Sequence, residues 1–322
     1  MAVYTEVTDD ALAAFLADYD LGKLVAFRGI AEGVENSNYS LRTTTGDYIL
    51  TLYERRVDPA DLPWFLGLME HLARRGISCP LPVHGRDERA LRELAGRNAA
   101  ITTFLPGVWP RRVRPEHCGP LGAALAAMHL AGRDYPPTRR NALGPDEWPR
   151  LLERTWARAD EVRQGLAAEL DQALGAILSA WPRDLPNGHI HADLFPDNVF
   201  FQGEAVSGLI DFYFACTDFL AYDVAVCLNA WCFEPTGEFN VTKAGALLSA
   251  YQKVRPMSAA EMEALPILAR GSAMRFLLTR LYDWLNTPAG AMVKRKDPLE
   301  YERKLRFHAG IKSVADYGIK VS

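Results

Sequence analysis

The chain has 322 residues, of which 49% are hydrophobic and 24% are charged, and its formal net charge is −4 with an isoelectric point near 6.0. This length favours two moderate hydrophobic cores over one, and the weakly acidic balance gives no general attraction for nucleic acid or for an anionic membrane, so we expect a small-molecule partner. No apolar run approaches the roughly twenty residues of a membrane span, and the acidic start of the chain lacks the form of a signal peptide, which predicts a cytoplasmic protein.

The first hundred residues predict a small antiparallel sheet with two helices. Thr8 can cap a first helix that runs to about Tyr19 and carries its apolar residues on one face. A second amphipathic helix is expected at residues 64–74, ended by Gly76. Runs of β-branched and aromatic residues between turn residues predict five strands, at 24–30, 38–43, 48–54, 81–84 and 99–104.

After residues 105–107 (Leu-Pro-Gly) the pattern changes from strand to helix. Apolar residues recur with the helical period of about 3.6 at residues 121–130, at 148–179 and in long stretches after Asp223. The helical half is interrupted by one predicted hairpin, whose strands span residues 199–201 and 206–212.

These patterns predict an α+β fold with two lobes. We place the boundary near residue 106, so that residues 1–106 form a nucleotide-binding lobe of sheet and helix. Residues 107–322 then form a mostly helical lobe that carries catalysis and the substrate, and a cleft in such an arrangement would hold a nucleotide.

The five cysteines are odd in number and include no C-x-x-C pair, so they indicate neither a disulfide framework nor a zinc knuckle. We expect them to be buried small apolar residues. They are Cys79, Cys118, Cys216, Cys227 and Cys232.

The stretch HADLFPDN at residues 191–198, followed by Asp211 beyond an apolar strand, is the most informative motif of the chain. An Asp, an Asn five residues later and a second Asp after a strand are typical of a kinase catalytic loop and its metal-binding strand. Phosphoryl transfer needs a carboxylate near the acceptor hydroxyl, which suits Asp193. It also needs oxygen ligands for Mg²⁺, and the predicted hairpin brings Asn198 and Asp211 to the same end for that purpose.

A second interpretation of the same stretch is a zinc hydrolase, because His189, His191 and Asp193 form a His-x-His-x-Asp cluster. A hydrolase site would give Asn198 and Asp211 no task and would need further distant ligands. We therefore expect His191 to brace the catalytic loop.

The turn between the first two strands supplies glycines and polar residues where a loop over a nucleotide would lie, from Gly29 to Tyr39. The G-x-G-x-x-G spacing is not met, so this signal is weak alone. Protein kinases place a lysine on the third strand to hold phosphates, whereas this strand places Thr51 there. Either another cation binds the phosphates, or the chain binds nucleotide without transferring phosphate.

The whole chain resembles the bacterial homoserine kinases of the aminoglycoside-phosphotransferase, or protein-kinase-like, superfamily. The catalytic loop is shared across that superfamily, while the glycine-loop and NAWC strings are narrower. The matching segments are FRGIAEG at 27–33, ENSN at 35–38, LTL at 50–52, HADLF at 191–195, DNV at 197–199, LIDFY at 209–213, AC at 215–216, YD at 222–223, NAWC at 229–232, RF at 275–276 and RL at 280–281.

The resemblance implies ATP-dependent phosphorylation of the side-chain hydroxyl of L-homoserine, a step towards threonine. That family also looks to carry threonine at the position of Thr51. In this interpretation Asp193 is catalytic, Asn198 and Asp211 hold Mg²⁺, and Asp223 anchors the catalytic loop with His191. The residues expected at the nucleotide are Gly29, Gly33, Ser37, Asn38, Thr51 and Phe104.

Homoserine carries a carboxylate, which is best held by a bidentate arginine. Arg275 and Arg280 lie in an otherwise apolar segment, where a charge is costly unless it is paired. We predict Arg275 as the carboxylate ligand; the alternative is that either arginine pairs with a structural acid such as Asp283 or extends to solvent.

Two other functions stay open at this point. One is a kinase of the same fold that acts on another amino alcohol or on an aminoglycoside, which would prefer an acidic acceptor pocket. The other is a nucleotide-binding pseudokinase, which Thr51 motivates. No pattern in the sequence defines an oligomeric state.

Overall fold

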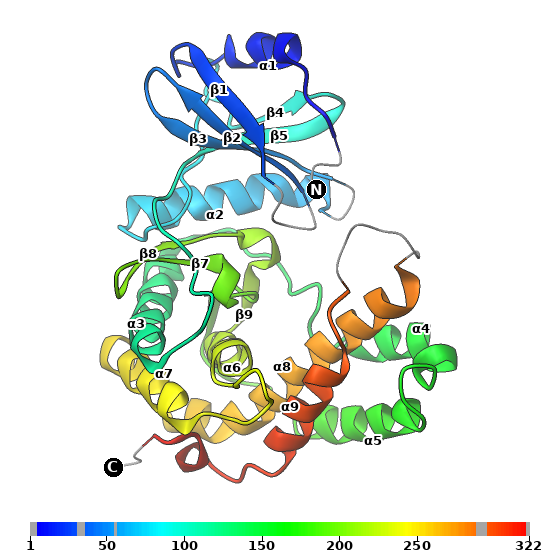
Figure 1. Cartoon of the computed structure of the whole chain (residues 1–322). Helices are drawn as coiled ribbons and strands as arrows, with labels where there is room; N and C mark the ends of the chain where they lie inside the picture. Colours follow the sequence, from blue (N-terminus) through cyan, green and yellow to red (C-terminus); the bar gives the residue numbers. More distant parts are fainter. Residues whose placement is uncertain (1–4, 31–35, 55–56, 288–294, 320–322) are drawn as a thin grey trace. The chain divides into compact units, whose positions relative to one another are not determined.

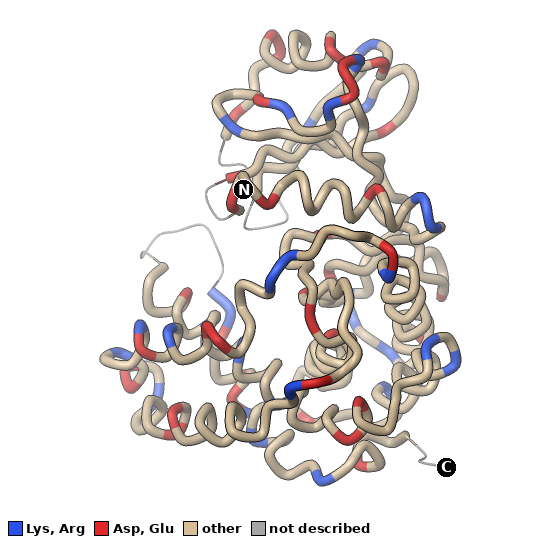
Figure 2. Tube along the Cα trace, turned by 180° about the vertical axis from the view of Figure 1, so that it is seen from behind, with Lys and Arg blue, Asp and Glu red and all other residues tan. Residues whose placement is uncertain are grey.

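The structure is a computed structural model that describes residues 5–30, 36–54, 57–287 and 295–319 (Figure 1). The chain divides into two compact units. The first comprises residues 1–107 together with Ser207–Tyr213, and the second comprises Val108–Val206 and Phe214–Ser322. Acidic and basic residues are interspersed along both units (Figure 2).

The first unit is built on a five-stranded antiparallel sheet in the order β1-β2-β3-β5-β4. Its helix α1 (Asp9–Leu16) packs its apolar residues against one face of the sheet, and Figure 1 shows α2 (Leu62–Arg74) on the other side. The strands are β1 (Leu24–Gly29), β2 (Ser37–Thr43), β3 (Asp47–Leu52), β4 (Leu91–Leu94) and β5 (Arg97–Thr103).

The beginning of α1 is as predicted, because the Thr8 hydroxyl accepts from the Ala11 amide at 3.3 Å. The helix ends at Leu16, three residues before the predicted end at Tyr19. Leu12 and Phe15 of α1 are buried against the sheet residues that share the core. This packing of an amphipathic helix on a sheet face forms the core of the first unit.

The strand predicted at residues 81–84 is wrong. Pro82 makes only an isolated bridge to Thr102, and prolines at 80 and 82 have no N–H to donate to a ladder. The edge of the sheet is instead β4, which the sequence did not indicate. It pairs with β5 through a tight turn at Ala95 and Gly96, which have φ of 51° and 71°.

The second unit is mostly helical. The helix α6 lies between α3, α7 and α8 (Figure 1), and nearly all of its residues are buried. The helices are α3 (Pro115–Ala131), α4 (Trp148–Ala159), α5 (Leu166–Ser179), α6 (Leu220–Trp231), α7 (Val241–Val254), α8 (Ala259–Asn286) and α9 (Leu299–Ala309). The chain also forms two small sheets, β6 (Asn187–Ile190) with β9 (Cys216–Phe219) and β7 (Val199–Gln202) with β8 (Ala205–Leu209). The residues of β8 from Ser207 onward are counted in the first unit.

The single helix predicted at residues 148–179 is wrong, since the structure has α4 and α5 there. The chain turns at Gly165, which has a left-handed φ of 77°. The carboxylate of Asp160 accepts from the amides of Gly165 and Ala167, both at 3.0 Å, and so satisfies donors at the start of α5. The periodic apolar pattern continues through this turn, and for this reason the sequence predicts one helix over residues 148–179.

The segment Ser207–Tyr213 differs from a simple division of the chain near residue 106, because it belongs to the first unit. The amide of Leu209 donates to the Ser78 carbonyl at 2.9 Å, and the Ser207 hydroxyl donates to the Pro106 carbonyl at 2.8 Å. The second strand of the predicted hairpin also ends early, at Leu209, so that Asp211 lies two residues beyond β8.

Candidate active site

The loop that follows β6 has an unusual backbone. Ala192 has a φ of 61°, a left-handed conformation that non-glycine residues rarely adopt and that persists only where neighbouring groups hold it. Its amide donates to the Asp223 carboxylate at 2.9 Å, and its carbonyl accepts from the guanidinium of Arg275. The loop is therefore held on both sides of this one residue.

Asp223 lies in the first turn of α6 and is fully buried. Besides Ala192, it accepts from the backbone amide of His191 at 2.7 Å, and Nε2 of His129 lies 3.1 Å from its Oδ2. Burial alone would raise the pKa of Asp223. The hydrogen bond and charge of His129, together with the hydrogen bond from the His191 backbone amide, outweigh burial, so the pKa of Asp223 is lowered. An ionised carboxylate in this position orders the loop that carries Asp193.

Asp193 is half-buried, and its backbone carbonyl accepts from the Phe195 amide at 2.8 Å. Burial raises the pKa of Asp193 to about 6, although the nearby charges of Arg275 and Lys296 act to lower it. A carboxyl group with this pKa can accept a proton near neutral pH, as a general base must.

Asn198 is oriented by the same loop. Its Nδ2 donates to the Asp193 carbonyl at 2.8 Å, which leaves the amide oxygen as the atom suited to a cation. Asp211 belongs to the first unit and has a left-handed φ of 65°. An amide oxygen and a carboxylate are ligands that Mg²⁺ prefers, so the chemistry of these two donors fits that ion.

The His-x-His-x-Asp pattern looks different in three dimensions. The Nε2 atom of His189 lies 2.8 Å from the Tyr135 carbonyl oxygen, while the side chain of His191 is fully buried. Over the described ranges, no three His, Cys, Asp or Glu side chains are grouped so that they could hold a metal ion. The geometry thus gives the zinc hydrolase interpretation no support.

Arg275 of α8 lies within the core, with 2% of its surface exposed. Its Nη1 donates to the Ala192 carbonyl, and the guanidinium lies 4.3 Å from the ring centre of Phe276. Arg280 forms an ion pair with Glu300 at 2.6 Å. The predicted carboxylate-binding role of Arg275 stays a prediction.

Several residues predicted at the nucleotide lie in the first unit. Gly29 ends β1 opposite Tyr39, while Gly33 lies outside the described residues. Ser37 is fully buried, and its hydroxyl donates to the Glu54 carboxylate at 2.7 Å, so its proton is already used in that hydrogen bond. Phe104 follows β5 and has 44% of its surface exposed, and its role at a nucleotide stays a prediction.

Thr51 is buried in β3 and donates to the side-chain oxygen of Asn38 at 2.8 Å, on the adjacent strand. The strand continues into Tyr53, whose hydroxyl lies 3.0 Å from that of Tyr213. The two rings also meet edge to face, with centroids 5.2 Å apart. Sequence reasoning missed this tyrosine pair, because no spacing rule relates residues so distant in the chain. The Tyr53–Tyr213 pair places an aromatic contact two residues after Asp211.

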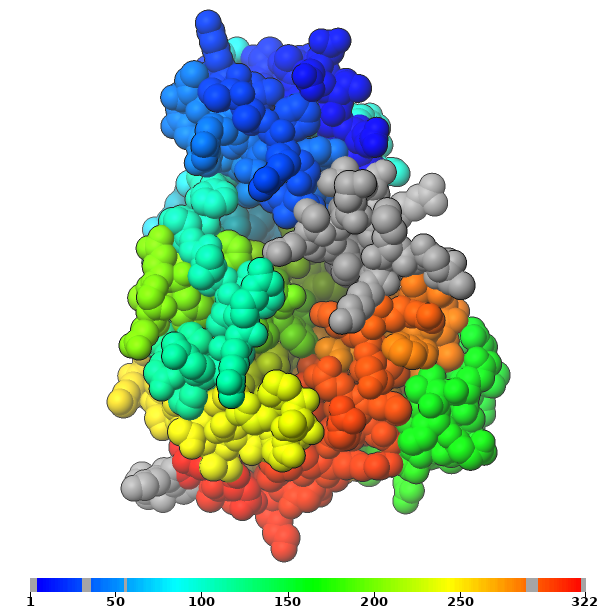
Figure 3. Space-filling model, in the orientation of Figure 1, coloured from blue at the N-terminus to red at the C-terminus, as the bar shows by residue number. Residues whose placement is uncertain are grey.

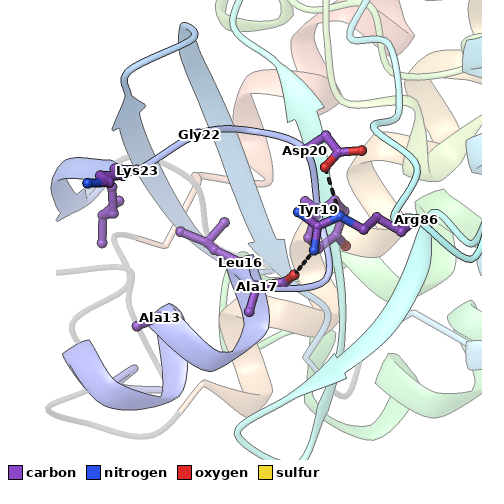
Figure 4. Close-up of a pocket in the computed structure, with 9 residues that line it drawn as sticks. Ala13, Leu16, Ala17, Tyr19, Asp20, Gly22, Lys23 and Arg86 are labelled. Atoms are coloured by element: carbon purple, nitrogen blue, oxygen red, sulfur yellow. Dashed lines mark hydrogen bonds and ion pairs between the residues drawn. The ribbon is translucent and has the colours of Figure 1, made fainter.

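The first unit also carries a surface hollow of about 500 Å³ between the end of α1 and the start of β1 (Figure 4). Arg86 lies across it, and its guanidinium donates to the Asp20 carboxylate at 2.7 Å and to the Ala17 carbonyl at 2.6 Å. Arg86 and Asp20 thus bind one another, and none of the predicted site residues lines the hollow.

Comparison with known proteins agrees with the geometry of the catalytic loop. Residues 26–257 match the model of the phosphotransferase enzyme family. The chain is 72% identical to a homoserine kinase of Acidiphilium cryptum over 99% of this chain and 100% of that protein. It is 66% identical to a homoserine kinase of Granulibacter bethesdensis, with the same coverage. A solved structure of the amicoumacin kinase hAmiN superposes with a TM-score of 0.68 at 16% identity, covering 94% of this chain and 93% of that one.

The fold is thus the α+β fold of the aminoglycoside-phosphotransferase, protein-kinase-like class. The chain belongs to the phosphotransferase enzyme family and, by its full-length identity, to the homoserine kinases within it. In the part of the chain that the structure describes, no helix combines the length and the apolar composition needed to span a membrane.

Proposed function

We propose that this protein is a homoserine kinase, which transfers the γ-phosphoryl group of ATP to the side-chain hydroxyl of L-homoserine and so forms O-phospho-L-homoserine for threonine biosynthesis. The observation that carries the proposal is full-length identity of 72% to a homoserine kinase, in a chain that contains Asp193, Asn198 and Asp211. The location expected for such an enzyme is the cytoplasm.

Asp193 acts on the acceptor. The homoserine hydroxyl oxygen forms the new bond to the γ-phosphorus while the bond to the β-phosphate oxygen breaks, so that ADP leaves. Asp193 orients the hydroxyl and accepts its proton, and the pKa of about 6 suits this task at neutral pH. The bonds from Asp223 and Arg275 to the loop keep the carboxylate in place.

Asn198 and Asp211 are the residues that would hold Mg²⁺. A bound divalent cation supplies charge neutralisation for the phosphates. The Asn198 side chain is already oriented by its hydrogen bond to the Asp193 carbonyl. Asn198, which would bind the ion, and Asp193, which would accept the proton, are therefore linked within one loop.

The remaining assignments follow the family resemblance. Gly29, Gly33, Ser37, Asn38, Thr51 and Phe104 are proposed at the nucleotide. Arg275 is proposed at the homoserine carboxylate, and His191 and Asp223 as support of the loop.

The test is an ATP-consumption assay of the purified protein across a panel of hydroxyl acceptors: L-homoserine, 3-aminopropanol, choline and an aminoglycoside. We expect consumption with homoserine and little with acceptors that lack its carboxylate. Equal activity on 3-aminopropanol would contradict the substrate assignment, and nucleotide binding without consumption on any acceptor would indicate a pseudokinase.

A further inference from the structure

Two cations lie beside the loop that carries Asp193, within the second unit. Arg275 contacts the residue before Asp193, and Lys296 lies over the ring of Phe195, two residues after it. They differ in exposure. Arg275 is buried and donates to the Ala192 carbonyl, whereas the side chain of Lys296 is exposed to solvent.

The position of Lys296 relative to the loop is defined by Phe195. The Nζ atom of Lys296 lies 5.5 Å from the ring centre of Phe195, the second residue after Asp193. Phe195 is itself fixed by an edge contact with Phe276 of α8, at 4.9 Å between ring centres. An exposed cation is attracted only weakly to an aromatic face, and this attraction uses none of the N–H donors of the ammonium group. The Lys296 ammonium group therefore lies near the loop and can still donate hydrogen bonds to a ligand.

Both chain neighbours of Lys296 are held to α8. The guanidinium of Arg295 donates to the Trp284 carbonyl at 3.1 Å, and the guanidinium of Arg280 donates to the backbone carbonyl of Asp297 at 3.3 Å. The helices α8 and α9 form part of the surface of the second unit (Figure 3). The lysine side chain therefore extends from an anchored segment, which limits the entropy lost when it binds a ligand.

The reaction needs positive charge at this loop. Homoserine brings a carboxylate, and the transferring phosphoryl group carries negative charge on its oxygens. The strand position at which protein kinases carry a lysine is Thr51 here, whose hydroxyl donates to Asn38 and brings no charge.

We propose that Lys296 binds an oxyanion of the reactants at Asp193, either the acceptor carboxylate or the transferring phosphoryl group. The proposal rests on the proposed function, since it assumes that phosphoryl transfer takes place at Asp193. Lys296 lies outside the segments by which the chain resembles the homoserine kinases.

The test compares Lys296→Ala, Lys296→Arg and the control Lys312→Ala, which removes an exposed lysine after α9. We expect Lys296→Ala to lower kcat/KM for homoserine by about tenfold or more, Lys296→Arg to recover most of it, and Lys312→Ala to stay near the parent. Thermal unfolding should be unchanged in all three, because both lysine side chains are exposed.

The source of the oxyanion is read from the kinetic constants. A higher homoserine KM with an unchanged kcat, together with unchanged weak activity on 3-aminopropanol, identifies the carboxylate. A lower kcat on both acceptors with unchanged KM values identifies the phosphoryl group. Parental constants in Lys296→Ala would overturn the inference while leaving the proposed function intact, whereas a parent without homoserine kinase activity would overturn the proposed function.

Discussion

Asp193 is the residue on which the proposed chemistry depends most. We expect Asp193→Asn to lower kcat by roughly a hundredfold or more, because the amide cannot accept the hydroxyl proton. Nucleotide affinity should stay within a few-fold of the parent, since Asp193 acts on the acceptor. Steady-state kinetics and equilibrium titration with a non-hydrolysable ATP analogue measure the two quantities, and near-parental turnover would rule out this role.

The pKa of about 6 for Asp193 predicts an acid limb in the activity. A general base works in its deprotonated form, so kcat/KM for homoserine should be full above this pKa and should fall as the pH drops through it. Measurements of kcat/KM for homoserine between about pH 5 and about pH 8 would show this loss of activity at low pH.

Lys296→Ala removes a charge that lowers the pKa of Asp193, so the acid limb of this variant should move to higher pH, and that of Lys312→Ala should not. A profile that is flat through pH 6 in the parent would contradict the assignment of Asp193 as base.

Arg275 combines a predicted substrate contact with an observed contact to the loop. Arg275→Lys keeps the charge but loses the planar fork, so we expect a strong rise in the homoserine KM with little change in the KM for ATP. A fall in kcat should accompany it, because the bond to the Ala192 carbonyl is weakened. A lower kcat at an unchanged homoserine KM would leave Arg275 as support of the loop and remove it from the acceptor site.

At the scale of elements, the end of β3 is joined to the residues that follow Asp211. Tyr53 and Tyr213 share a hydroxyl hydrogen bond, and Tyr213 also packs edge-on against Phe65 of α2, with ring centres 5.7 Å apart. Asp211 has a left-handed backbone, which persists only where surrounding groups hold it, so we expect the contacts of Tyr213 to help fix the position of Asp211.

We therefore expect Tyr213→Phe, which keeps the ring and loses the hydroxyl, to raise the Mg²⁺ concentration needed for half-maximal activity. Asp211→Asn should raise it further and weaken binding of MgATP. Tyr53→Phe removes the same hydrogen bond from the other side, so the double variant should be no worse than either single one. Additive effects of the two tyrosine variants, or an unchanged Mg²⁺ requirement in all variants, would contradict this coupling.

At the scale of the whole molecule, the five cysteines are free and buried, as predicted. Burial raises the pKa of Cys79 to about 12 and also raises the pKa values of Cys216, Cys227 and Cys232. The thiolate is the reactive form, so the native protein should react very slowly with a chromogenic disulfide reagent, and all five thiols should react after denaturation. Rapid reaction of even one thiol in the native protein would show that a cysteine is accessible.

Local patterns in the sequence were enough for much of the framework. The capping residue Thr8, the meander of three strands and the α+β class follow from short-range rules, because hydrophobic period and turn chemistry act over a few residues. The spacing of Asp193, Asn198 and Asp211 is also local, which is why the motif can be found without coordinates.

The tertiary structure alone decided which distant groups meet. Arg275 and the Ala192 carbonyl are 83 residues apart in the chain, and Tyr53 and Tyr213 are 160 residues apart, so no periodicity relates them. The same holds for the edge of the sheet, where β4 pairs with residues 97–100 of β5 and the segment with two prolines adds only an isolated bridge to Thr102. Sequence spacing determines which chemical groups are available, whereas the packing of the helices and strands determines which of them share a site.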